Sequence, residues 1–329
     1  MRVTFYSAHA YDIAYFEGNQ SYHQFSFVKE RLDLATARYA EGMDAICIAS
    51  TDVADKAVIT MLNKLRIGLI IVRSSGLDNI DTNAADNAGI ALKCLPGYSP
   101  QAIAEHAAAL LLTLNRNIHL ARERVLKGDF SIEGLMGFNL YNKTVGIVGI
   151  GRVGYAFSRI MKGFGCRILG FDTKQNLSAY DDIQLVSFVD LLQGSDIISL
   201  HCSLNDTSKS IINAQALELI KPGALLINVA QGKLVDTKAV LTALNKGTLG
   251  AYVTDVYEDE SNFFYQTFQS IEKLTDPLLK MLIQHPNVLL TSHQAFFTKE
   301  AMQQMTCTII NELTYYESLT GGLADRLII

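Results

Sequence analysis

Three glycines are spaced so that they could bind a cofactor that carries phosphate. In the segment GIVGIGRVG (146–154), Gly149, Gly151 and Gly154 form the pattern G-x-G-x-x-G. The first glycine permits a tight turn, the second lets the backbone approach a pyrophosphate, and the third lets the next helix lie close to a sheet. The N–H groups in the first turn of that helix can then bind phosphate.

The residues around these glycines are those that such a site needs. A β-rich run precedes them, an apolar helical stretch follows, and a second β-rich run ends in Asp172, 18 residues after Gly154. A carboxylate at this point accepts hydrogen bonds from the ribose hydroxyls of adenosine and repels the 2′-phosphate of NADP. The sequence therefore predicts NAD as the cofactor, and a plain strand–turn–helix connection packed by glycines is the alternative.

NAD exchanges a hydride, and this chemistry needs a side chain that gives or takes a proton. His293 directly follows the apolar run VLLTS (288–292), at a strand end of the kind where α/β sites form. The segment TDVYEDE (254–260) ends another run with carboxylates, and a carboxylate beside His293 would fix its tautomer and raise its pKa. We predict that His293 is the acid–base group. We expect His106, in an apolar helical stretch, to be a packed residue, whereas His201 is a candidate for lining the cofactor cleft.

Length and composition are those of a globular chain of about two domains. The 329 residues are 49% hydrophobic and 19% charged, which excludes a disordered protein. The net charge of −5 argues against a general nucleic-acid binder, which usually carries a basic face. The sequence begins without a signal-peptide pattern, its apolar runs are too short to span a membrane, and its five cysteines form no CxxC. We therefore expect a cytoplasmic protein without a nucleic-acid or membrane partner and without a metal.

Short apolar runs rich in Val and Ile alternate with helix-like stretches along the chain. The runs are continuously apolar, which is typical of parallel strands buried on both faces, and their alternation with helices predicts an α/β fold. The predicted strands are VTFY (3–6), AICIA (45–49), LIIVR (69–73), TVGIVG (144–149), RILGFD (167–172), IISLH (197–201), ALLINV (224–229), AYVTDV (251–256) and VLLTS (288–292).

Two helical segments have recognisable ends. Gly247 stands where the segment 236–247 should have its C-terminal cap. Ser99 and Pro100 suit the cap and first position of another helix, which is followed by a loop-like segment, 130–143. The apolar residues of this helix predict one long element, with a wide stripe made of Ile103, Ala107, Leu110, Leu111, Leu114 and Ile118.

Seven motifs together make the chain similar to a known family. It resembles the D-isomer-specific 2-hydroxyacid dehydrogenases and, within them, the bacterial fermentative D-lactate dehydrogenases, over nearly its full length. The motifs are VRSSGLDNID (72–81), PGYSPQAIAEHAAALLLTLNR (96–116), GIVGIGRVG (146–154), ISLHC (198–202), GALLINVAQGKLVD (223–236), TDVYEDE (254–260) and SHQAFFT (292–298).

The order of these motifs predicts a discontinuous domain. Motifs that belong with the substrate lie both before and after the glycines, so we expect residues 1–98 and 297–329 to form a substrate domain. A Rossmann NAD-binding domain, residues 99–296, would be inserted into it. The resemblance implies two parallel-sheet domains, Rossmann-like and flavodoxin-like, with the active site in the cleft between them and assembly into a homodimer or homotetramer.

The resemblance also implies a role for each matching position. His293 would protonate the keto oxygen, and Glu260 would be its carboxylate partner. The substrate would meet the backbone of Ser75 and Gly76 and the rings of Tyr98 and Phe296. The cofactor would contact a set of strand ends and helix starts, namely Gly149, Gly151, Arg152, Val153, Gly154, Asp172, Cys202, Ser203, Val229, Ala230, Asp255 and Ile103.

One position departs from the family pattern. The family reads N-x-x-R-G where this chain has Asn228 to Gly232, so Gln231 occupies the place of the arginine that clamps the substrate. Glutamine is neutral and cannot make the charged, two-pronged bond of arginine to a carboxylate. Arg73, near the substrate loop, is no evident replacement because the family usually has it as well. An engineered substitution, a natural paralogue with weak or altered activity, and adaptation to a substrate that needs no second anionic clamp all fit Gln231.

Three functional hypotheses follow. The first is an enzyme that reduces pyruvate, or a close small 2-keto acid, to the D-2-hydroxy acid with NADH. The second is a non-catalytic NAD(H)-binding sensor or partner-binding protein of the same fold, which Gln231 motivates and the retention of His293 and Glu260 opposes. The third keeps the enzyme class but changes the substrate to a branched 2-keto acid, phosphoglycerate or formate.

Overall fold

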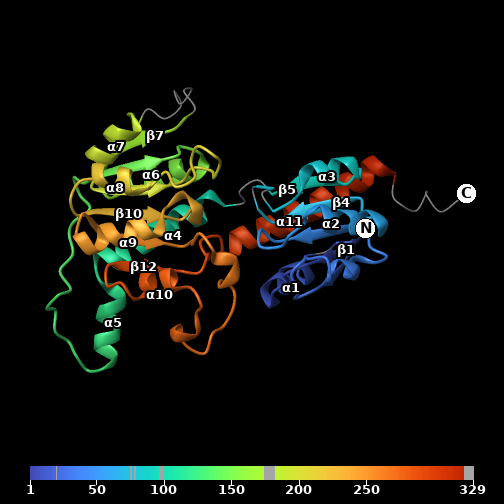
Figure 1. The fold of residues 1–329 in the computed structure, drawn as a ribbon, viewed down its shortest axis with the longest axis horizontal. Helices are drawn as coiled ribbons and strands as arrows, with labels where there is room; N and C mark the ends of the chain where they lie inside the picture. The colour runs from blue at the N-terminus through green and yellow to red at the C-terminus, as the bar shows by residue number, and fades with distance from the viewer. Residues whose placement is uncertain (20, 75, 78, 96–98, 174–181, 322–329) are drawn as a thin grey trace, which may run out of the picture. The chain divides into compact units, whose positions relative to one another are not determined.

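The computed structural model divides the chain into two compact units, and the chain passes between them twice (Figure 1). Met1–Ser99 and Phe297–Ile329 form the first unit, and Pro100–Phe296 forms the second. The structure describes residues 1–19, 21–74, 76–77, 79–95, 99–173 and 182–321. Each unit is a parallel sheet with helices on both faces, which confirms the predicted α/β fold.

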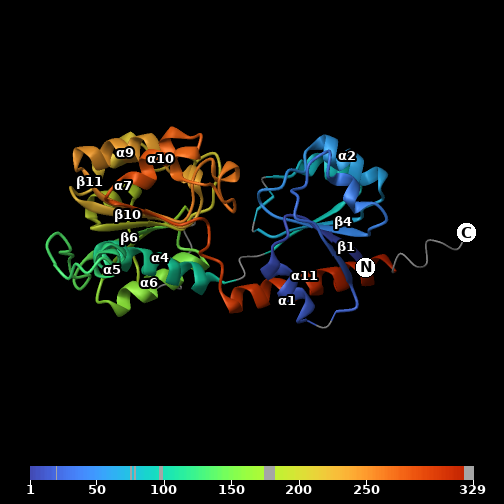
Figure 2. The same cartoon turned by 90° about the horizontal axis from the view of Figure 1, so that it is seen from below.

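The first unit has five strands in the order β2-β1-β3-β4-β5. In Figure 2, α2 covers one face of this sheet, and α1 and α11 cover the other. The strands are β1 (Arg2–Phe5), β2 (Gln24–Phe27), β3 (Ala45–Ile48), β4 (Leu69–Val72) and β5 (Ala91–Cys94). The helices are α1 (Ala10–Glu17), α2 (Lys56–Lys64), α3 (Thr82–Asn87) and α11 (Lys299–Thr320), with a short 3-10 helix at Ala37–Ala40.

The second unit has seven strands in the order β12-β11-β10-β9-β6-β7-β8. They are β6 (Thr144–Val148), β7 (Arg167–Phe171), β8 (Gln184–Leu185), β9 (Ile197–Leu200), β10 (Ala224–Asn228), β11 (Leu249–Thr254) and β12 (Val288–Leu290). The chain builds outwards from β6 in one direction and from its neighbour β9 in the other, so the strand order reverses between them. Ligands of open α/β sheets bind at the carboxyl ends of strands beside such a reversal.

Helices cover both faces of this second sheet. In Figure 2, α9 and α10 lie over one face, and α4 and α6 lie over the other. The helices are α4 (Pro100–Asn115), α5 (Ile118–Leu126), α6 (Arg152–Gly163), α7 (Phe188–Gly194), α8 (Ala214–Leu219), α9 (Thr237–Lys246) and α10 (Pro277–Gln284). Short 3-10 helices lie at Gly232–Leu234, Glu260–Asn262 and Ile271–Lys273. Among the described residues, no helix combines the length and hydropathy required to cross a bilayer.

All nine predicted runs are strands, and most of them are buried along their whole length. Three strands that the sequence pattern missed, β2, β5 and β8, stand at the edges of the two sheets. An edge strand is covered less completely than a central one, so its residues need not be continuously apolar. This explains the mixed compositions QFSF and ALKC, and β8 has only two residues.

The prediction of one long helix after Ser99 is wrong at its end. The chain forms two helices, α4 and α5, separated at Arg116 and Asn117. Asn117 has φ 49°, in the left-handed region that asparagine tolerates better than most residues. As a result Ile118 leaves the apolar stripe and is 53% exposed, whereas Leu111 on α4 is fully buried.

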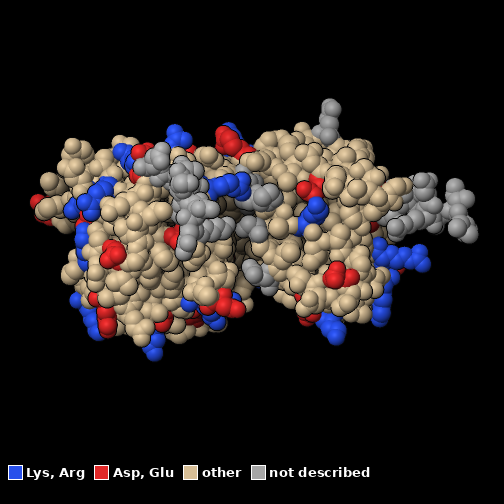
Figure 3. All heavy atoms as spheres, turned by 90° about the horizontal axis from the view of Figure 1, so that it is seen from above, with Lys and Arg blue, Asp and Glu red and all other residues tan. Residues whose placement is uncertain are grey.

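Asn115, the last residue of α4, ties the segment 130–143 to the unit. Its Nδ2 donates to the carbonyl oxygen of Phe138 at 2.8 Å, and its Oδ1 accepts from the N–H of Phe138 at 3.0 Å. Phe130, Ile132 and Met136 in the same segment are more than three-quarters exposed. The segment is therefore fastened to the end of α4 at Phe138, while most of its apolar side chains face outwards. On the face drawn in Figure 3, basic and acidic side chains are interspersed.

We predict that Asn115→Ala destabilises the second unit by about 1–3 kcal/mol, because it leaves the backbone polar groups of Phe138 without partners. Urea unfolding measures the loss, and hydrogen exchange should show faster exchange at Phe138. Asn245→Ala is the matched control, since Asn245 donates only to the carbonyl of Leu241 in its own helix. Equal effects of the two substitutions would contradict the prediction.

Candidate active site

The glycine turn follows β6 and leads into α6. Gly149 has φ 93°, and a Cβ added there would lie 2.5 Å from the backbone nitrogen of Cys202, so a larger residue would clash. A Cβ on Gly154 would collide with the carbonyl oxygen of Gly149. Gly151 caps α6 and has open space where its Cβ would be. Two glycines are therefore required by the protein's own packing, and the third leaves room for a ligand at the helix N-terminus.

Asp172 comes directly after β7 and faces this turn. Its Oδ2 accepts from the N–H of Ile150 at 2.8 Å. The carboxylate therefore lies beside the glycine turn, although Asp172 is 18 residues after Gly154 in the sequence. Arg152 is exposed and Val153 is half-buried in the first turn of α6. This arrangement fits a dinucleotide whose pyrophosphate meets the helix N-terminus and whose ribose meets the carboxylate.

Cys202 and Ser203 follow β9 on the other side of the turn. Burial raises the pKa of the Cys202 thiol to about 11, so the group is a neutral thiol. The charge of Asp172 also raises this pKa, whereas a hydrogen bond to the backbone of Cys202 lowers it. Ser203 is exposed, and its carbonyl accepts from Ser208 Oγ at 2.7 Å.

His201, the candidate for lining the cofactor cleft, is turned into the protein interior. Its ring packs against Phe157 of α6, with 5.1 Å between ring centroids, and its Nε2 lies 2.8 Å from Ser199 Oγ. Burial lowers the pKa of His201 to about 3, so its ring is neutral and structural.

His293 and Glu260 form the central pair of the site. His293 Nδ1 lies 2.6 Å from Glu260 Oε1, and the other carboxylate oxygen of Glu260 accepts from the N–H of Tyr257 at 3.1 Å. Glu260 is thus oriented by the backbone that follows β11, and it fixes which nitrogen of His293 is engaged. The Nε2 of His293 is left as the nitrogen that can exchange a proton with a substrate.

The backbone of His293 is held in a sparsely populated conformation. Its φ is 53°, which is uncommon for a residue with a side chain. Its N–H donates to the carbonyl of Asp255 at 2.7 Å, and its carbonyl accepts from the hydroxyl of Tyr265 at 2.8 Å. Hydrogen bonds to the N–H and to the carbonyl of His293 therefore hold this backbone conformation and keep the ring directed at Glu260. A strained residue persists only where surrounding contacts hold it in this way.

Two opposing effects set the pKa of His293. Burial by itself lowers this pKa, because it disfavours the charged ring. The hydrogen bond and the charge of Glu260, together with the charge of Asp255, outweigh burial and raise the pKa above its ordinary value of 6.5. His293 therefore remains protonated to a higher pH than a free histidine.

Asp255 is a buried carboxylate with several protein donors. Thr291 Oγ1 donates to Oδ1 at 2.6 Å, the N–H of Gln294 donates to Oδ1 at 2.9 Å, and the N–H of Ala295 donates to Oδ2 at 2.8 Å. Burial tends to raise the pKa of Asp255, but these bonds and one from His106 hold it below its ordinary value. The carboxylate is therefore charged and fastens the turn on either side of His293.

His106 is mostly buried, as the prediction of a packed residue requires, but its contacts are polar and were not predicted. Its Nε2 lies 3.1 Å from Thr291 Oγ1 and 3.3 Å from Asp255 Oδ1, and its side chain is 17% exposed. An apolar helix pattern cannot predict these polar contacts, because the partners of His106 are about 150 and 185 residues away along the chain. Tyr265 was missed for the same reason: its partner is the backbone of His293, and a loop tyrosine has no pattern of its own.

Gln231 lies three residues after the end of β10 and caps the 3-10 helix Gly232–Leu234, and its side chain is exposed. Its carbonyl accepts from Asn228 Nδ2 at 2.9 Å, which shapes the turn. Val229 is buried and Ala230 is half-buried in the same turn.

Arg73 is occupied within the first unit. It forms an ion pair with Asp12 at 3.4 Å, donates to the carbonyls of Tyr6 and Ser7, and lies over the ring of Phe5. These contacts make it a structural residue of that unit.

The other predicted site residues are Ser75, Gly76, Tyr98, Phe296 and Ile103. Ser75 and Tyr98 lie outside the described residues. The carbonyl of Gly76 accepts from Ser74 Oγ at 3.0 Å. The ring of Phe296 stands edge-on to that of His293, with 6.5 Å between centroids. Ile103 on α4 is half-buried and packs on the apolar core of the second unit.

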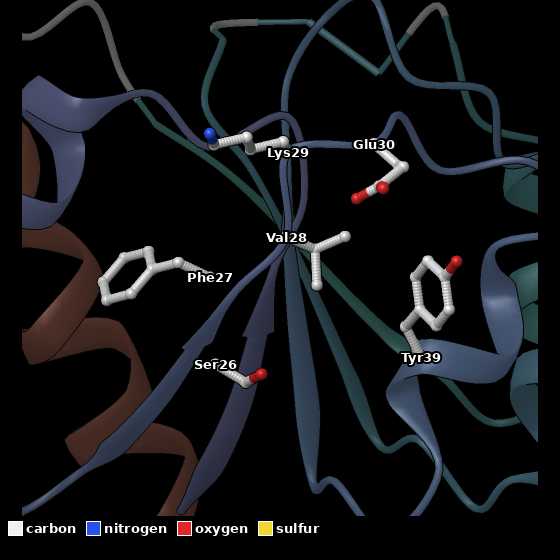
Figure 4. Close-up of a pocket in the computed structure, with 6 residues that line it drawn as sticks. All are labelled: Ser26, Phe27, Val28, Lys29, Glu30 and Tyr39. Atoms are coloured by element: carbon white, nitrogen blue, oxygen red, sulfur yellow. The ribbon is translucent and has the colours of Figure 1, made fainter.

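A hollow elsewhere in the first unit contains none of these residues. It lies at the end of β2 and is lined by Ser26, Phe27, Val28, Lys29, Glu30 and Tyr39. In Figure 4 Phe27 and Tyr39 lie on opposite sides of Val28, and the charged ends of Lys29 and Glu30 do not converge. It has no set of polar groups aimed at one point, so it does not compete as an active site.

Known proteins match this chain over its length. The model of the family described as D-isomer specific 2-hydroxyacid dehydrogenase, NAD binding domain, matches residues 108–295. The 2-hydroxyacid dehydrogenase A of Aspergillus oryzae is 39% identical, covering 95% of this chain and 91% of its own, and the D-lactate dehydrogenase of Escherichia coli is 37% identical, covering 96% and 97%. A solved structure described as the pyruvate reductase of Chlamydomonas reinhardtii has a TM-score of 0.88 and 36% identity, covering 96% of each chain.

The fold and the glycine turn thus define a dinucleotide-dependent oxidoreductase of the α/β class. More narrowly, the chain belongs to the D-isomer-specific 2-hydroxyacid dehydrogenase family, and it is an NAD-dependent dehydrogenase. The prediction of NAD from the glycines and Asp172 is confirmed by the NAD-binding domain that matches residues 108–295.

We predict that Gly149→Ala and Gly151→Ala fail in different ways. The first should lower the melting temperature by several degrees, because its Cβ meets the backbone at Cys202, whereas the second should leave it nearly unchanged. Gly151→Ala should still weaken NADH binding tenfold or more, since its Cβ fills space reserved for the pyrophosphate. Differential scanning fluorimetry and NADH titration measure the two effects, and unimpaired NADH binding in Gly151→Ala would count against the site.

We predict that Glu260→Gln removes a pH-dependent part of the stability. Because the pKa of His293 is raised in the folded state, the pair stabilises fully below pH 6.5, and this contribution is lost as the pH rises through the folded pKa. The substitution should therefore cost about 1–2 kcal/mol at pH 6 and less at pH 9.5, measured by urea unfolding. Asp259→Asn, at an exposed neighbouring carboxylate, is the control. A cost that grows with pH would refute the linkage.

Proposed function

We propose that this protein reduces pyruvate, or a closely related small 2-oxo acid, to the D-2-hydroxy acid with NADH. The observation that carries the proposal is the 2.6 Å contact between His293 and Glu260, which supplies a histidine held ready as a proton donor. A relative named D-lactate dehydrogenase and a structure described as a pyruvate reductase support this substrate class.

His293 supplies the proton in the proposed reaction. Bound NADH supplies a hydride to the carbonyl carbon of the substrate. The protonated His293 gives the proton on Nε2 to the carbonyl oxygen, and Glu260 stabilises the charged ring through Nδ1 until that transfer. The raised pKa of His293 keeps the donor form populated around neutral pH, where reduction needs it.

The proposed cofactor site runs along the carboxyl ends of the central strands of the second unit. Gly149, Gly151, Arg152, Val153 and Gly154 would meet the pyrophosphate, and Asp172, Cys202 and Ser203 would meet the adenosine. Val229, Ala230 and Ile103 would border the nicotinamide. Asp255 has a different part: its carboxylate is fully buried and bonded to protein groups, so we assign it to the support of His293.

The proposed substrate contacts come from both parts of the sequence. The backbone of Ser75 and Gly76 would bind the carboxylate, and Tyr98 and Phe296 would limit the size of the side chain. Gln231 would reach the substrate with a neutral amide, because it follows β10 with an exposed side chain. An amide bonds a carboxylate more weakly than a guanidinium does, so we expect a low affinity for 2-oxo acids.

We also propose a homodimer or homotetramer. Exposed apolar side chains gather on α5 and on the segment 130–143, which is more apolar surface than a monomer usually shows. They are Ile118, Val125, Leu126, Phe130, Ile132, Met136, Phe138 and Tyr141. Light scattering that finds a monomer at micromolar concentration would refute this assembly.

We predict that Gln231→Arg raises kcat/KM for pyruvate about 30- to 5000-fold, because a charged pair at the carboxylate is worth about 2–5 kcal/mol. Steady-state NADH oxidation with a panel of 2-oxo acids measures the gain. Gln231→Lys should gain less, since an ammonium lacks the two-pronged geometry of arginine. Gln193→Arg, which adds the same charge at an exposed position on α7, is the control.

The same experiment separates the enzyme from a non-catalytic NAD(H)-binding protein. Gln231 is the one observation that favours the second function. If NADH binds tightly by calorimetry but no 2-oxo acid is reduced, even by Gln231→Arg, the proposed reaction fails and the binding protein is favoured.

A further inference from the structure

Three elements of the second unit meet at the carboxylate of Asp255. Asp255 follows β11, Thr291 follows β12, and His106 lies on α4. His106 Nε2 is 3.3 Å from Asp255 Oδ1 and 3.1 Å from Thr291 Oγ1, and Thr291 Oγ1 is 2.6 Å from Asp255 Oδ1. His106 is the member of this cluster that no part of the proposed mechanism uses.

The hydrogen atoms in this cluster can be assigned from its chemistry. Asp255 is charged, since its pKa lies below the ordinary value, and a charged carboxylate only accepts hydrogen bonds. Thr291 must therefore donate its single hydroxyl hydrogen to Asp255. The nitrogen of His106 that faces both oxygens must then carry a hydrogen, which it shares between Thr291 and Asp255.

The same carboxylate controls the backbone around His293. It accepts the N–H groups of Gln294 and Ala295, the two residues after His293, while the carbonyl of Asp255 accepts the N–H of His293 itself. A shift or rotation of the Asp255 side chain would release this turn. His293 would then leave its left-handed backbone conformation and its contact with Glu260.

We propose that His106 is a positioning residue for His293, and that it acts by donating a hydrogen bond from Nε2 to Asp255 and Thr291. The backbone donors and Thr291 come from the segment that Asp255 must hold, 291–295, whereas His106 comes from a separate helix. Its bond therefore ties the turn that carries His293 to α4, which packs against α6 and against β10, β11 and β12. This role depends on His293 being the proton donor proposed above.

The charges around the two histidines predict the direction of an electrostatic effect. Asp255 faces His106, and Glu260 and Asp255 act on His293, while the hydroxyl of Tyr265 bonds its carbonyl. The hydrogen bond from His106 holds Asp255 in place, and Asp255 holds the turn that keeps His293 against Glu260. Without it the contact with Glu260 would loosen, and because that contact is the main effect that raises the pKa of His293, this pKa would fall.

Two substitutions of His106 test the proposal. His106→Leu removes the donor, whereas His106→Gln retains an N–H near the position of Nε2. In His106→Leu we expect kcat for pyruvate to fall about tenfold or more, because a hydrogen bond to a charged group is lost, with KM and the Kd for NADH within about threefold of wild type. His106→Gln should keep kcat within about threefold of wild type. His285→Gln is the control, because His285 bonds only the nearby backbone at Asn287.

A second measurement does not depend on turnover. An NMR titration of the His293 ring in the NADH-free protein should show a lower pKa in His106→Leu than in wild type, because the contact with Glu260 is loosened, and little change in His106→Gln or His285→Gln. The proposal is overturned if His106→Leu keeps wild-type kcat and the wild-type titration of His293, or if His106→Gln is as impaired as His106→Leu. If wild type and Gln231→Arg both turn over no 2-oxo acid, the proposed reaction fails, and the titration alone decides the role of His106.

Discussion

The buried carboxylate of Asp255 is the constraint on which the geometry of the site depends. A charge without solvent must be surrounded by donors, and here most of the donors belong to the turn that carries His293. Satisfying the carboxylate therefore also fixes the backbone of His293, the proposed proton donor. The strained φ of His293 is the visible consequence, because the surrounding bonds outweigh the preference of a residue with a side chain.

The charges that act on the His293 ring are both negative. Glu260 and Asp255 place two negative charges beside His293, which favours the protonated ring and so the reducing direction. The same charges repel the carboxylate of an incoming 2-oxo acid. A local arginine would normally offset that repulsion, and the net charge of −5 makes such a residue more important. In the proposed site Gln231 would supply no such charge, and Arg73 is already paired with Asp12.

Burial explains which strands could be predicted from the sequence. Central strands such as β4 and β9 are covered on both faces, so their residues are apolar in an unbroken run. The edge strands β2 and β5 meet a neighbour on one side only, and their pattern is not distinct from that of a loop. The break between α4 and α5 was missed because Ile118 continues the spacing of the apolar stripe, whereas the left-handed backbone of Asn117 turns the chain out of the helix.

By itself the sequence determined the class of fold, the cofactor and the pair of residues proposed for acid–base chemistry. It could do so because glycine spacing and strand ends are local patterns with few physical solutions, and because the resemblance to the family implied Glu260 as the partner of His293. Only the tertiary structure decided how His293 is held. Asp255 and Tyr265 bond the turn around His293, and His106 bonds Asp255 and Thr291 from a separate helix, so these hydrogen bonds exist only in the folded unit. A side chain whose partners are distant in the chain leaves no local signal, because its role is set by packing.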